Sequence, residues 1–168
     1  MQTRYDNFSK YQLKIFVMKI MDYFFSIFYR LIWYIFFPFS YFYVLGRSLK
    51  EPGYAKNFSE RLGLYKSDFR DAIWIHAVSL GEFRAARPIF IKLLQNNEKL
   101  LITTLTLAGR RAAEMEFKEQ IQKGNVAIFY NPLELDFLFS IFIRRHAPKF
   151  CVILECDLWP VMIWSIKR

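Results

Sequence analysis

Residues 72–82 read AIWIHAVSLGE, an apolar run that leads through a glycine into a carboxylate. The first seven of these residues are apolar apart from His76, which predicts a buried strand. A helical pattern follows, with apolar side chains at Phe83, Ala86, Phe90, Leu93 and Leu94. Pro88 lies inside that pattern and cannot donate a helix hydrogen bond, so the helix either begins close to Pro88 or is kinked there.

The alternation of strand and helix continues along the rest of the chain. Further strands are predicted at 99–104, 126–129 and 150–154. Helices are predicted at 108–121 and 133–146, and another opens at Trp159-Pro160, where proline suits a first turn. Repeated strand-helix units form right-handed crossovers and a parallel sheet. We therefore expect an α/β domain with a Rossmann-like parallel sheet over residues 49–168.

Residues 1–48 form a separate region that is hydrophobic and aromatic. Between Asp22 and Arg47 lie twenty-four residues whose only charge is Arg30. A membrane-spanning helix needs about 20 apolar residues, and Arg30 and Pro38 divide this run into shorter pieces. The abundant Trp and Tyr suit the headgroup level, so an interfacial or re-entrant anchor fits as well as a tilted span. The alternative is a buried helix packed on the domain. We expect a hydrophobic membrane-anchoring helix.

The composition also favours a membrane as the partner. Apolar residues make up 54% of the chain and aromatic residues 20%, and the formal net charge is +9. Such a charge suits either nucleic acid or anionic lipid. The basic residues are scattered and flank the aromatic segment, and the sequence contains no recognised nucleic-acid-binding motif. We therefore expect no nucleic-acid partner.

The cysteines and histidines predict no metal centre. Cys151 and Cys156 are separated by four residues, and His76 and His146 are far from each other in sequence. This spacing matches no metal-ligand pattern, and both thiols are expected to be structural in a reduced, cytosolic setting.

Ligands of parallel sheets bind beyond the carboxyl ends of the strands, so the residues directly after each strand are the candidates for a site. Glu82 follows Gly81 in a strand-to-helix turn, where the backbone can pass close to a ligand and a carboxylate can act as a general base. The alternative is that Glu82 complements the dipole of the helix. On spacing alone, the second role is favoured.

The second strand end offers hydroxyl groups. Thr104 and Thr106, together with helix-start amides and Ser79 of the first strand end, could hold a phosphate or a sugar hydroxyl. Threonine is equally ordinary in strands and at helix N-caps. The sequence has neither a Walker lysine nor a Gly-x-Gly-x-x-Gly run, so nucleotide binding by this region has little support.

Charged residues occupy the remaining positions. Glu155 and Asp157 lie two residues apart after the last strand, where a site and a solvated loop or helix cap are equally open. Arg84 and Arg110 fall in the first turns of two helices, where they could meet phosphates or simply be solvated.

Four segments resemble, in order as well as content, the N-terminal domain of the bacterial Kdo transferases, which attach 3-deoxy-D-manno-octulosonic acid (Kdo) to the lipid A precursor. They are ERLGLY at 60–65, HAVSLGE at 76–82, TTLTLAG at 103–109 and ECDLWP at 155–160. The resemblance covers roughly residues 45–168. The hydrophobic leader is also similar to the membrane anchor of that family.

The resemblance implies the N-terminal, acceptor-binding half of a GT-B glycosyltransferase, an enzyme with two Rossmann-like domains. It implies an inverting transfer, without metal or cofactor, from CMP-Kdo to the lipid A precursor (lipid IVA) in lipopolysaccharide core biosynthesis. The enzyme would work at the inner membrane with its catalytic domain facing the cytoplasm. Glu82 then corresponds to the proposed base of the family and Glu155 to a second acid. The further candidates for acceptor binding or a second acid are Asp157, Ser79, Gly81, Thr104, Thr106, Arg84 and Arg110.

The chain departs from the family at a few points. Cys156 and Asp157 replace a threonine and a glutamate that are usual there, and Ala108 replaces a threonine. The chain also ends at Arg168, where the family continues into the C-terminal domain that binds CMP-Kdo. We therefore expect a truncated or split form of the enzyme. The alternative is a non-catalytic membrane-bound module that binds lipid A precursor or a partner chain.

Overall fold

The computed structural model describes the backbone of residues 2–51, 53–154 and 159–167, and side chains from residue 17 onward except those of residues 41 and 45. By their internal contacts the residues divide into two units, Met1–Phe39 and Ser40–Arg168. The expected boundary between residues 48 and 49 stays a prediction.

Helix α1 runs from Gln2 to Lys50 and continues through Pro38. Its part from Val17 to Lys50 is long and apolar enough to cross a membrane, and an 18-residue window of it has a mean hydropathy of 1.3 and no buried residue. Phe24 and many other large apolar side chains are exposed along it. The guanidinium of Arg30 donates to the hydroxyl of Ser26 one turn earlier, at 3.0 Å. The expected hydrophobic helix is confirmed.

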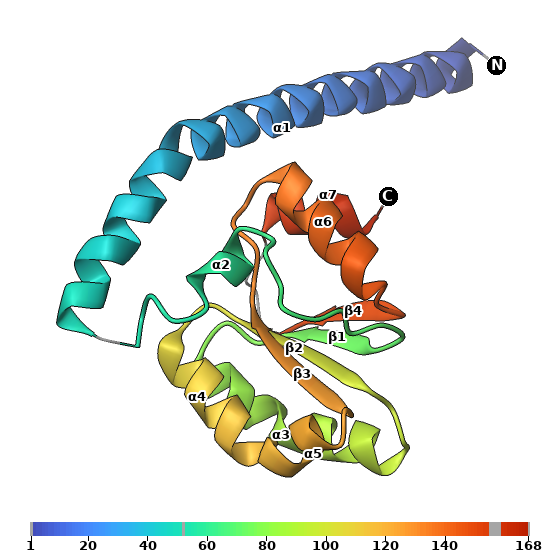
Figure 1. Ribbon diagram of the computed structural model, residues 1–168. Coiled ribbons are helices and arrows are strands. Elements are labelled where there is room, and N and C mark those ends of the chain that lie inside the picture. The colour runs from blue at the N-terminus through green and yellow to red at the C-terminus, as the bar shows by residue number, and fades with distance from the viewer. Residues whose placement is uncertain (1, 52, 155–158, 168) are drawn as a thin grey trace. The chain divides into compact units, whose positions relative to one another are not determined.

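Four parallel strands form the sheet of the second unit, in the order β3-β2-β1-β4. They are β1 (Ile73–His76), β2 (Leu100–Thr104), β3 (Val126–Tyr130) and β4 (Phe150–Ile153). One face carries α3 (Leu80–Gln95), α4 (Leu107–Glu116) and α5 (Lys118–Gln122), and the other carries α6 (Asp136–His146) and α7 (Pro160–Ile166) (Figure 1). The expected α/β, Rossmann-like parallel sheet is confirmed, and it is consistent with the N-terminal half of a GT-B enzyme.

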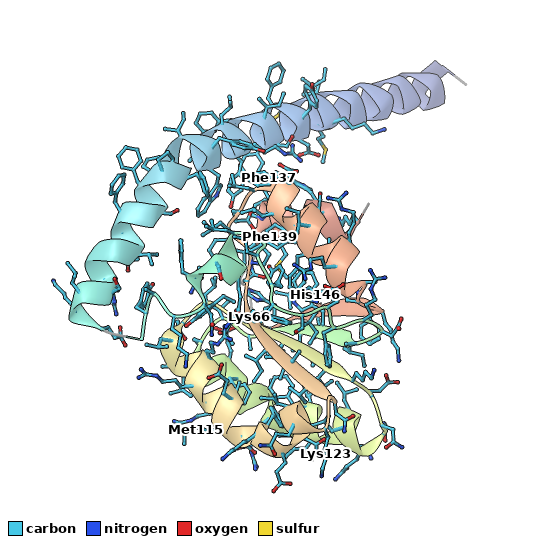
Figure 2. All side chains as sticks on the ribbon, in the orientation of Figure 1. Lys66, Met115, Lys123, Phe137, Phe139 and His146 are labelled. Atoms are coloured by element: carbon cyan, nitrogen blue, oxygen red, sulfur yellow. The ribbon has the colours of Figure 1, made fainter. Side chains whose placement is uncertain are left out.

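Each face of the sheet has its own core. Ile75, Phe83 and Phe90 are buried on the side of α3 and α4. On the other side, Trp74 contacts Phe142 of α6, with 4.7 Å between ring centroids. Figure 2 shows Phe139 and His146 inside this second layer, whereas Met115 and Lys123 lie at the periphery. Side chains alternate between the two faces along each strand, so every strand contributes to both cores. All four residues of the central strand β1 are therefore buried.

Several element boundaries differ from the sequence prediction. Helix α3 begins at Leu80 and passes through Pro88, so a start near Pro88 is wrong, because Ser79 already caps the helix. The helix predicted at 108–121 is two helices separated at Phe117. The helix predicted at 133–146 begins only at Asp136, after an irregular segment. The short helix α2 (Phe58–Arg61) was not expected, because four residues show no periodicity.

The carboxylate of Glu60 joins three elements inside the second unit. Glu60 lies on α2 and is 6% exposed. It accepts hydrogen bonds from both terminal nitrogens of Arg110 on α4 and from the backbone N–H of Tyr130 at the end of β3, the last at 2.9 Å. A buried ion pair is stable only when its remaining hydrogen-bonding groups are satisfied, and here the strand supplies a third donor.

Replacing Glu60 by Gln leaves the guanidinium of Arg110 buried without its main counter-ion. We expect Glu60→Gln to lower the free energy of unfolding by about 3–5 kcal/mol in urea titrations. The matched control is Glu114→Gln, because Glu114 also pairs with Arg110 but its side chain is 44% exposed. That change should cost below about 1 kcal/mol. Equal losses of unfolding free energy in the two variants would contradict the conclusion that Glu60 is the main counter-ion of Arg110.

His76 is held as a neutral imidazole at the end of β1. Its side chain is fully buried, and its Nδ1 lies 2.8 Å from the hydroxyl of Thr103, which also accepts from the indole N–H of Trp74. Burial lowers the pKa of His76 to about 4. An imidazole in the unfolded chain titrates near 6.5.

The unfolded state therefore takes up a proton at a higher pH than the folded state does. Stability from this group is complete above about pH 6.5 and is lost as the pH falls towards 4, with a total of roughly 3 kcal/mol. We expect His76→Gln to remove this part of the pH dependence, measured as the unfolding free energy of both proteins between pH 7 and 4. Parallel curves would show that His76 does not titrate differently in the two states.

Candidate functional site

The carboxyl edge of the sheet gathers three described segments, which follow β1, β2 and β3. They are residues 77–82, 105–109 and 131–135. Because the strands are parallel and in register, these segments lie along one edge, where parallel sheets bind ligands. Glu155 and Asp157 follow β4 but lie outside the described residues, so their site role stays a prediction.

Glu82 is held by its own turn. Ser79 is the N-cap of α3, and its hydroxyl accepts from the backbone N–H of Glu82 at 3.3 Å. The same hydroxyl donates to Oε1 of Glu82 at 2.9 Å, and the backbone N–H of Val78 donates to Oε2 at 2.8 Å. This resembles a capping box, which satisfies free amides at a helix start. Glu82 thus lies in the first turn of α3, where a negative charge complements the helix dipole, and its carboxylate also takes part in the cap.

The carboxylate of Glu82 can still accept further hydrogen bonds or a proton while it takes part in the cap. A carboxylate has about four lone-pair positions, and the bonds from Val78 and Ser79 use two of them. Glu82 is 6% exposed, so only a small part of its surface is accessible to a ligand. A Cβ added at Gly81 would meet only the Ser79 hydroxyl, at 3.7 Å. The described chain therefore does not crowd the backbone beside Glu82.

The start of α4 lies directly against the start of α3. Thr106 is the N-cap of α4 and accepts from the N–H of Gly109 at 3.1 Å. A Cβ added at Gly109 would lie 3.2 Å from the backbone carbonyl carbon of Ser79, so a larger residue there would push the two helix starts apart by a few tenths of an ångström. Thr104 is buried one residue beyond Thr103 at the end of β2. The structure thus brings Ser79, Glu82, Thr104 and Thr106 to one place.

The two candidate arginines differ in their surroundings. Arg84 is exposed on α3. Arg110 is 7% exposed and donates to Glu60, and its Nε donates to Glu114 at 2.7 Å. Burial opposes the charge of Arg110, but the hydrogen bonds and charges of these two carboxylates outweigh it and raise its pKa. Arg110 is thus already neutralised by protein groups, and its role in acceptor binding stays a prediction.

Several buried polar residues at the same edge were not assigned a role from the sequence. Glu134 is 2% exposed and accepts from the backbone N–H of Val161 at 2.9 Å, which fixes the start of α7. Asn131 is 1% exposed directly after β3, and its Oδ1 has no hydrogen-bond partner among the described residues. Arg61 stands in the ERLG run, and its guanidinium lies 4.1 Å from the ring centroid of Tyr130. Two features of the sequence could have pointed to these residues: Asn131 directly follows a predicted strand, and Arg61 belongs to the ERLG run of the family resemblance.

The described residues offer no ligand cluster for a metal, since no three His, Cys, Asp or Glu side chains among them could hold one. Burial raises the pKa of the Cys151 thiol to about 12, which keeps it protonated and unreactive at neutral pH. Cys156 lies outside the described residues.

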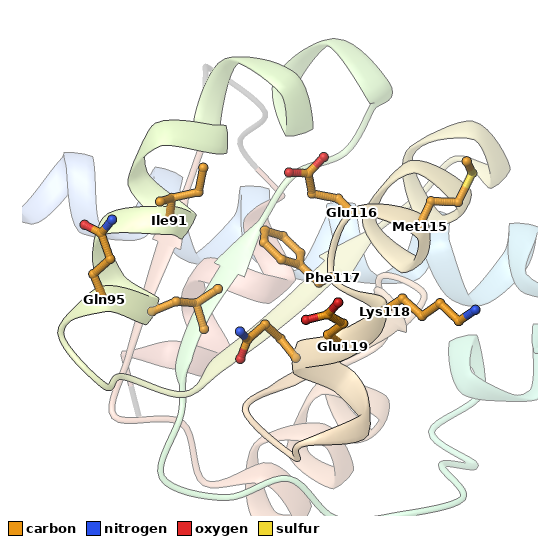
Figure 3. Close-up of a pocket in the computed structure, with 9 residues that line it drawn as sticks. Ile91, Gln95, Met115, Glu116, Phe117, Lys118 and Glu119 are labelled. Atoms are coloured by element: carbon orange, nitrogen blue, oxygen red, sulfur yellow. The ribbon is translucent and has the colours of Figure 1, made fainter.

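A groove of about 560 Å³ lies away from the carboxyl edge (Figure 3). It is lined by the C-terminal end of α3 (Ile91, Leu94 and Gln95) and by residues 115–120 of α4 and α5. The helices begin at the carboxyl edge, so their far ends place this groove on the opposite side of the domain from Glu82. None of the candidate site residues lines it.

Comparison with known proteins gives a consistent answer. Residues 56–168 match the family described as 3-Deoxy-D-manno-octulosonic-acid transferase (kdotransferase). The chain is similar to the 3-deoxy-D-manno-octulosonic acid transferase of Haemophilus influenzae, with 35% identity over 124 residues that cover 71% of this chain and 28% of that protein. It is also similar to the enzyme of that name from Bordetella pertussis, with 35% identity over 95 residues, 56% of this chain and 22% of that protein.

A more distant organism has a similar protein. The probable mitochondrial 3-deoxy-D-manno-octulosonic acid transferase of Arabidopsis thaliana is 31% identical over 133 residues, which are 76% of this chain and 28% of that protein. The chain spans less than a third of the length of these curated relatives. The family match extends from before α2 to α7 and so includes every strand end described above. The chain therefore belongs to the 3-deoxy-D-manno-octulosonic acid transferase (kdotransferase) family.

Proposed function

We propose that this chain is the acceptor-binding half of a glycosyltransferase that moves Kdo from CMP-Kdo to the lipid A precursor, lipid IVA. The observation that carries the proposal is the meeting of the α3 and α4 N-termini around Glu82, in a chain of this family. The donor CMP-Kdo is bound by a second Rossmann-like domain, as in the GT-B arrangement, and this chain supplies the facing wall.

Glu82 acts as the general base. It takes the proton from the acceptor hydroxyl as that oxygen attacks the anomeric carbon of Kdo, and the bond from that carbon to CMP breaks with inversion. The capping bonds from Ser79 and Val78 hold the carboxylate in one orientation, which general base catalysis requires. Free amides at two adjacent helix starts and the exposed Arg84 favour the negative phosphates of the acceptor. No metal or cofactor takes part in this mechanism.

Helix α1 anchors the enzyme at the inner membrane, with the catalytic domain on the cytoplasmic side. The support is the apolar part of α1 from Val17 to Lys50. A lipid acceptor stays in the bilayer, so an anchor keeps the enzyme at the membrane and raises the local concentration of the substrate.

The base assignment is tested with Glu82→Gln in the full-length protein, measured as Kdo transfer from CMP-Kdo to lipid IVA. Loss of a general base lowers kcat about 10²–10⁴-fold. Loss of capping alone costs about 0.5–2 kcal/mol of stability and leaves turnover of the folded protein unchanged. We expect the large loss in kcat. A folded variant whose turnover stays within about threefold of the wild type would leave Glu82 with the capping role only.

The anchor is tested with Leu31→Lys, which places a charge in the apolar part of α1. A lysine near the centre of a membrane helix costs about 2.5–3.5 kcal/mol of insertion free energy. We expect the membrane-bound fraction to fall in flotation with inner-membrane vesicles. Leu64→Lys is the matched control, because Leu64 is 63% exposed in the second unit and Leu31 is 54% exposed in α1. Equal flotation of the two variants would exclude this use of α1.

A further inference from the structure

Arg61 is a buried cation that no carboxylate of the described chain contacts. It is the last residue of α2 and is 7% exposed. Its Nη2 donates to the backbone oxygen of Leu105 at 2.5 Å, and its guanidinium carbon lies 4.1 Å from the ring centroid of Tyr130. Among the described residues no Asp or Glu oxygen lies within 4.0 Å of its guanidinium. Four of its five N–H donors thus have no hydrogen-bond partner there.

Arg110 provides the contrast, because it lies over the same ring. Its guanidinium carbon is 4.7 Å from the ring centroid of Tyr130, but Glu60 and Glu114 both pair with it. Burial lowers the pKa of Arg61 and the charge of Arg110 lowers it further, against the opposite effect of Tyr130 and Glu60. Arginine nevertheless stays protonated in proteins. The guanidinium groups of Arg61 and Arg110 thus both lie over the ring of Tyr130, but only Arg110 is paired with carboxylates.

The surroundings of Arg61 suit an anion. Leu105, to which Arg61 donates, lies between Thr104 and Thr106 and therefore at the start of α4, where helix amides favour negative charge. Asn131 follows Tyr130 at the end of β3, is 1% exposed and keeps an unpaired Oδ1 among the described residues. A phosphate group fits the planar donor fork of an arginine, and a neighbouring hydroxyl of the same molecule fits the amide oxygen.

We propose that Arg61 binds a phosphate ester of the acceptor sugar at the carboxyl edge of the sheet. The carbonyl of Leu105 and the ring of Tyr130 orient its donor fork, and Arg110, fixed by Glu60, is a positioning residue that holds Tyr130 in place. This inference rests on the proposed function in one respect, since it takes the ligand to be the phosphorylated glucosamine acceptor.

The test is the affinity of the purified 168-residue chain in detergent micelles for glucosamine 1-phosphate, measured by titration calorimetry. We expect Arg61→Gln to weaken binding at least tenfold, because a charge-assisted hydrogen-bonded pair is lost. Arg61→Lys keeps the charge but not the fork, and we expect a loss of about threefold or more. The matched control is Lys92→Gln, which removes one positive charge from the exposed far end of α3 and should leave the affinity unchanged.

The outcomes separate this inference from its alternatives. Unchanged affinity in folded Arg61→Gln, or in Arg61→Lys should the first variant fail to fold, overturns it. An equal loss in Lys92→Gln also overturns it, because binding would then follow net charge. Titration with CMP identifies the source of the phosphate: tighter binding of CMP than of glucosamine 1-phosphate, with the same dependence on Arg61, overturns the assignment to the acceptor.

This experiment also succeeds or fails independently of Kdo transfer. Binding of glucosamine 1-phosphate that depends on Arg61, in a full-length protein that transfers no Kdo, would refute the proposed function alone. Kdo transfer that depends on Glu82, with no effect of Arg61 on phosphate affinity, would refute this inference alone.

Discussion

A single buried carboxylate, that of Glu60, determines how the carboxyl edge of the sheet is assembled. Glu60 lies on the short helix α2, and its carboxylate accepts hydrogen bonds from Arg110 on α4 and from the backbone N–H of Tyr130 on β3. A four-residue helix is too short to be stable by itself, so α2 depends on this ion pair and on its packing for its place. Because Arg61 is the next residue, the same carboxylate also sets where that cation lies. The backbone of Arg61 in turn accepts from the N–H of Leu133, which ties α2 to the segment after β3.

The residues of this edge have two different physical tasks. Ser79 and Thr106 each accept from one amide at the starts of α3 and α4, and Glu134 accepts from two amides at the start of α7. The contact at Gly109 brings the first two helix starts together. Glu82 shares the capping task but retains unused lone pairs, so one carboxylate can be held rigid and still accept a proton. A base that is already oriented loses little entropy when the substrate arrives. If Glu82 is the base, as we propose, the hydrogen bonds that stabilise the start of α3 also orient the catalytic carboxylate.

The sequence was sufficient for the strands and their parallel arrangement, because short apolar runs alternate with helical patterns. It was insufficient where a long-range contact decides the outcome. The pair of Glu60 and Arg110 joins residues fifty positions apart, and no local pattern assigns α2 or the neutralisation of Arg110. The break at Phe117 has the same origin, because that ring is buried against Phe83 and Phe90. At the site, spacing favoured Glu82 as a partner of the helix dipole, and the structure adds its hydrogen bonds to Ser79 and Val78. Its role as a base came only from the family resemblance and stays a proposal.

If the acceptor binds at the carboxyl edge of this sheet, as we propose, its binding will be visible by hydrogen–deuterium exchange of the chain in lipid nanodiscs. Exchange is compared with and without lipid IVA in the bilayer. With lipid IVA present, we expect slower exchange of backbone amides in residues 78–82, 105–109 and 130–133, the segments that surround Glu82, Thr106 and Arg61. Slower exchange confined to residues 91–95 and 115–120, which line the groove at the far ends of α3 and α4, would contradict it.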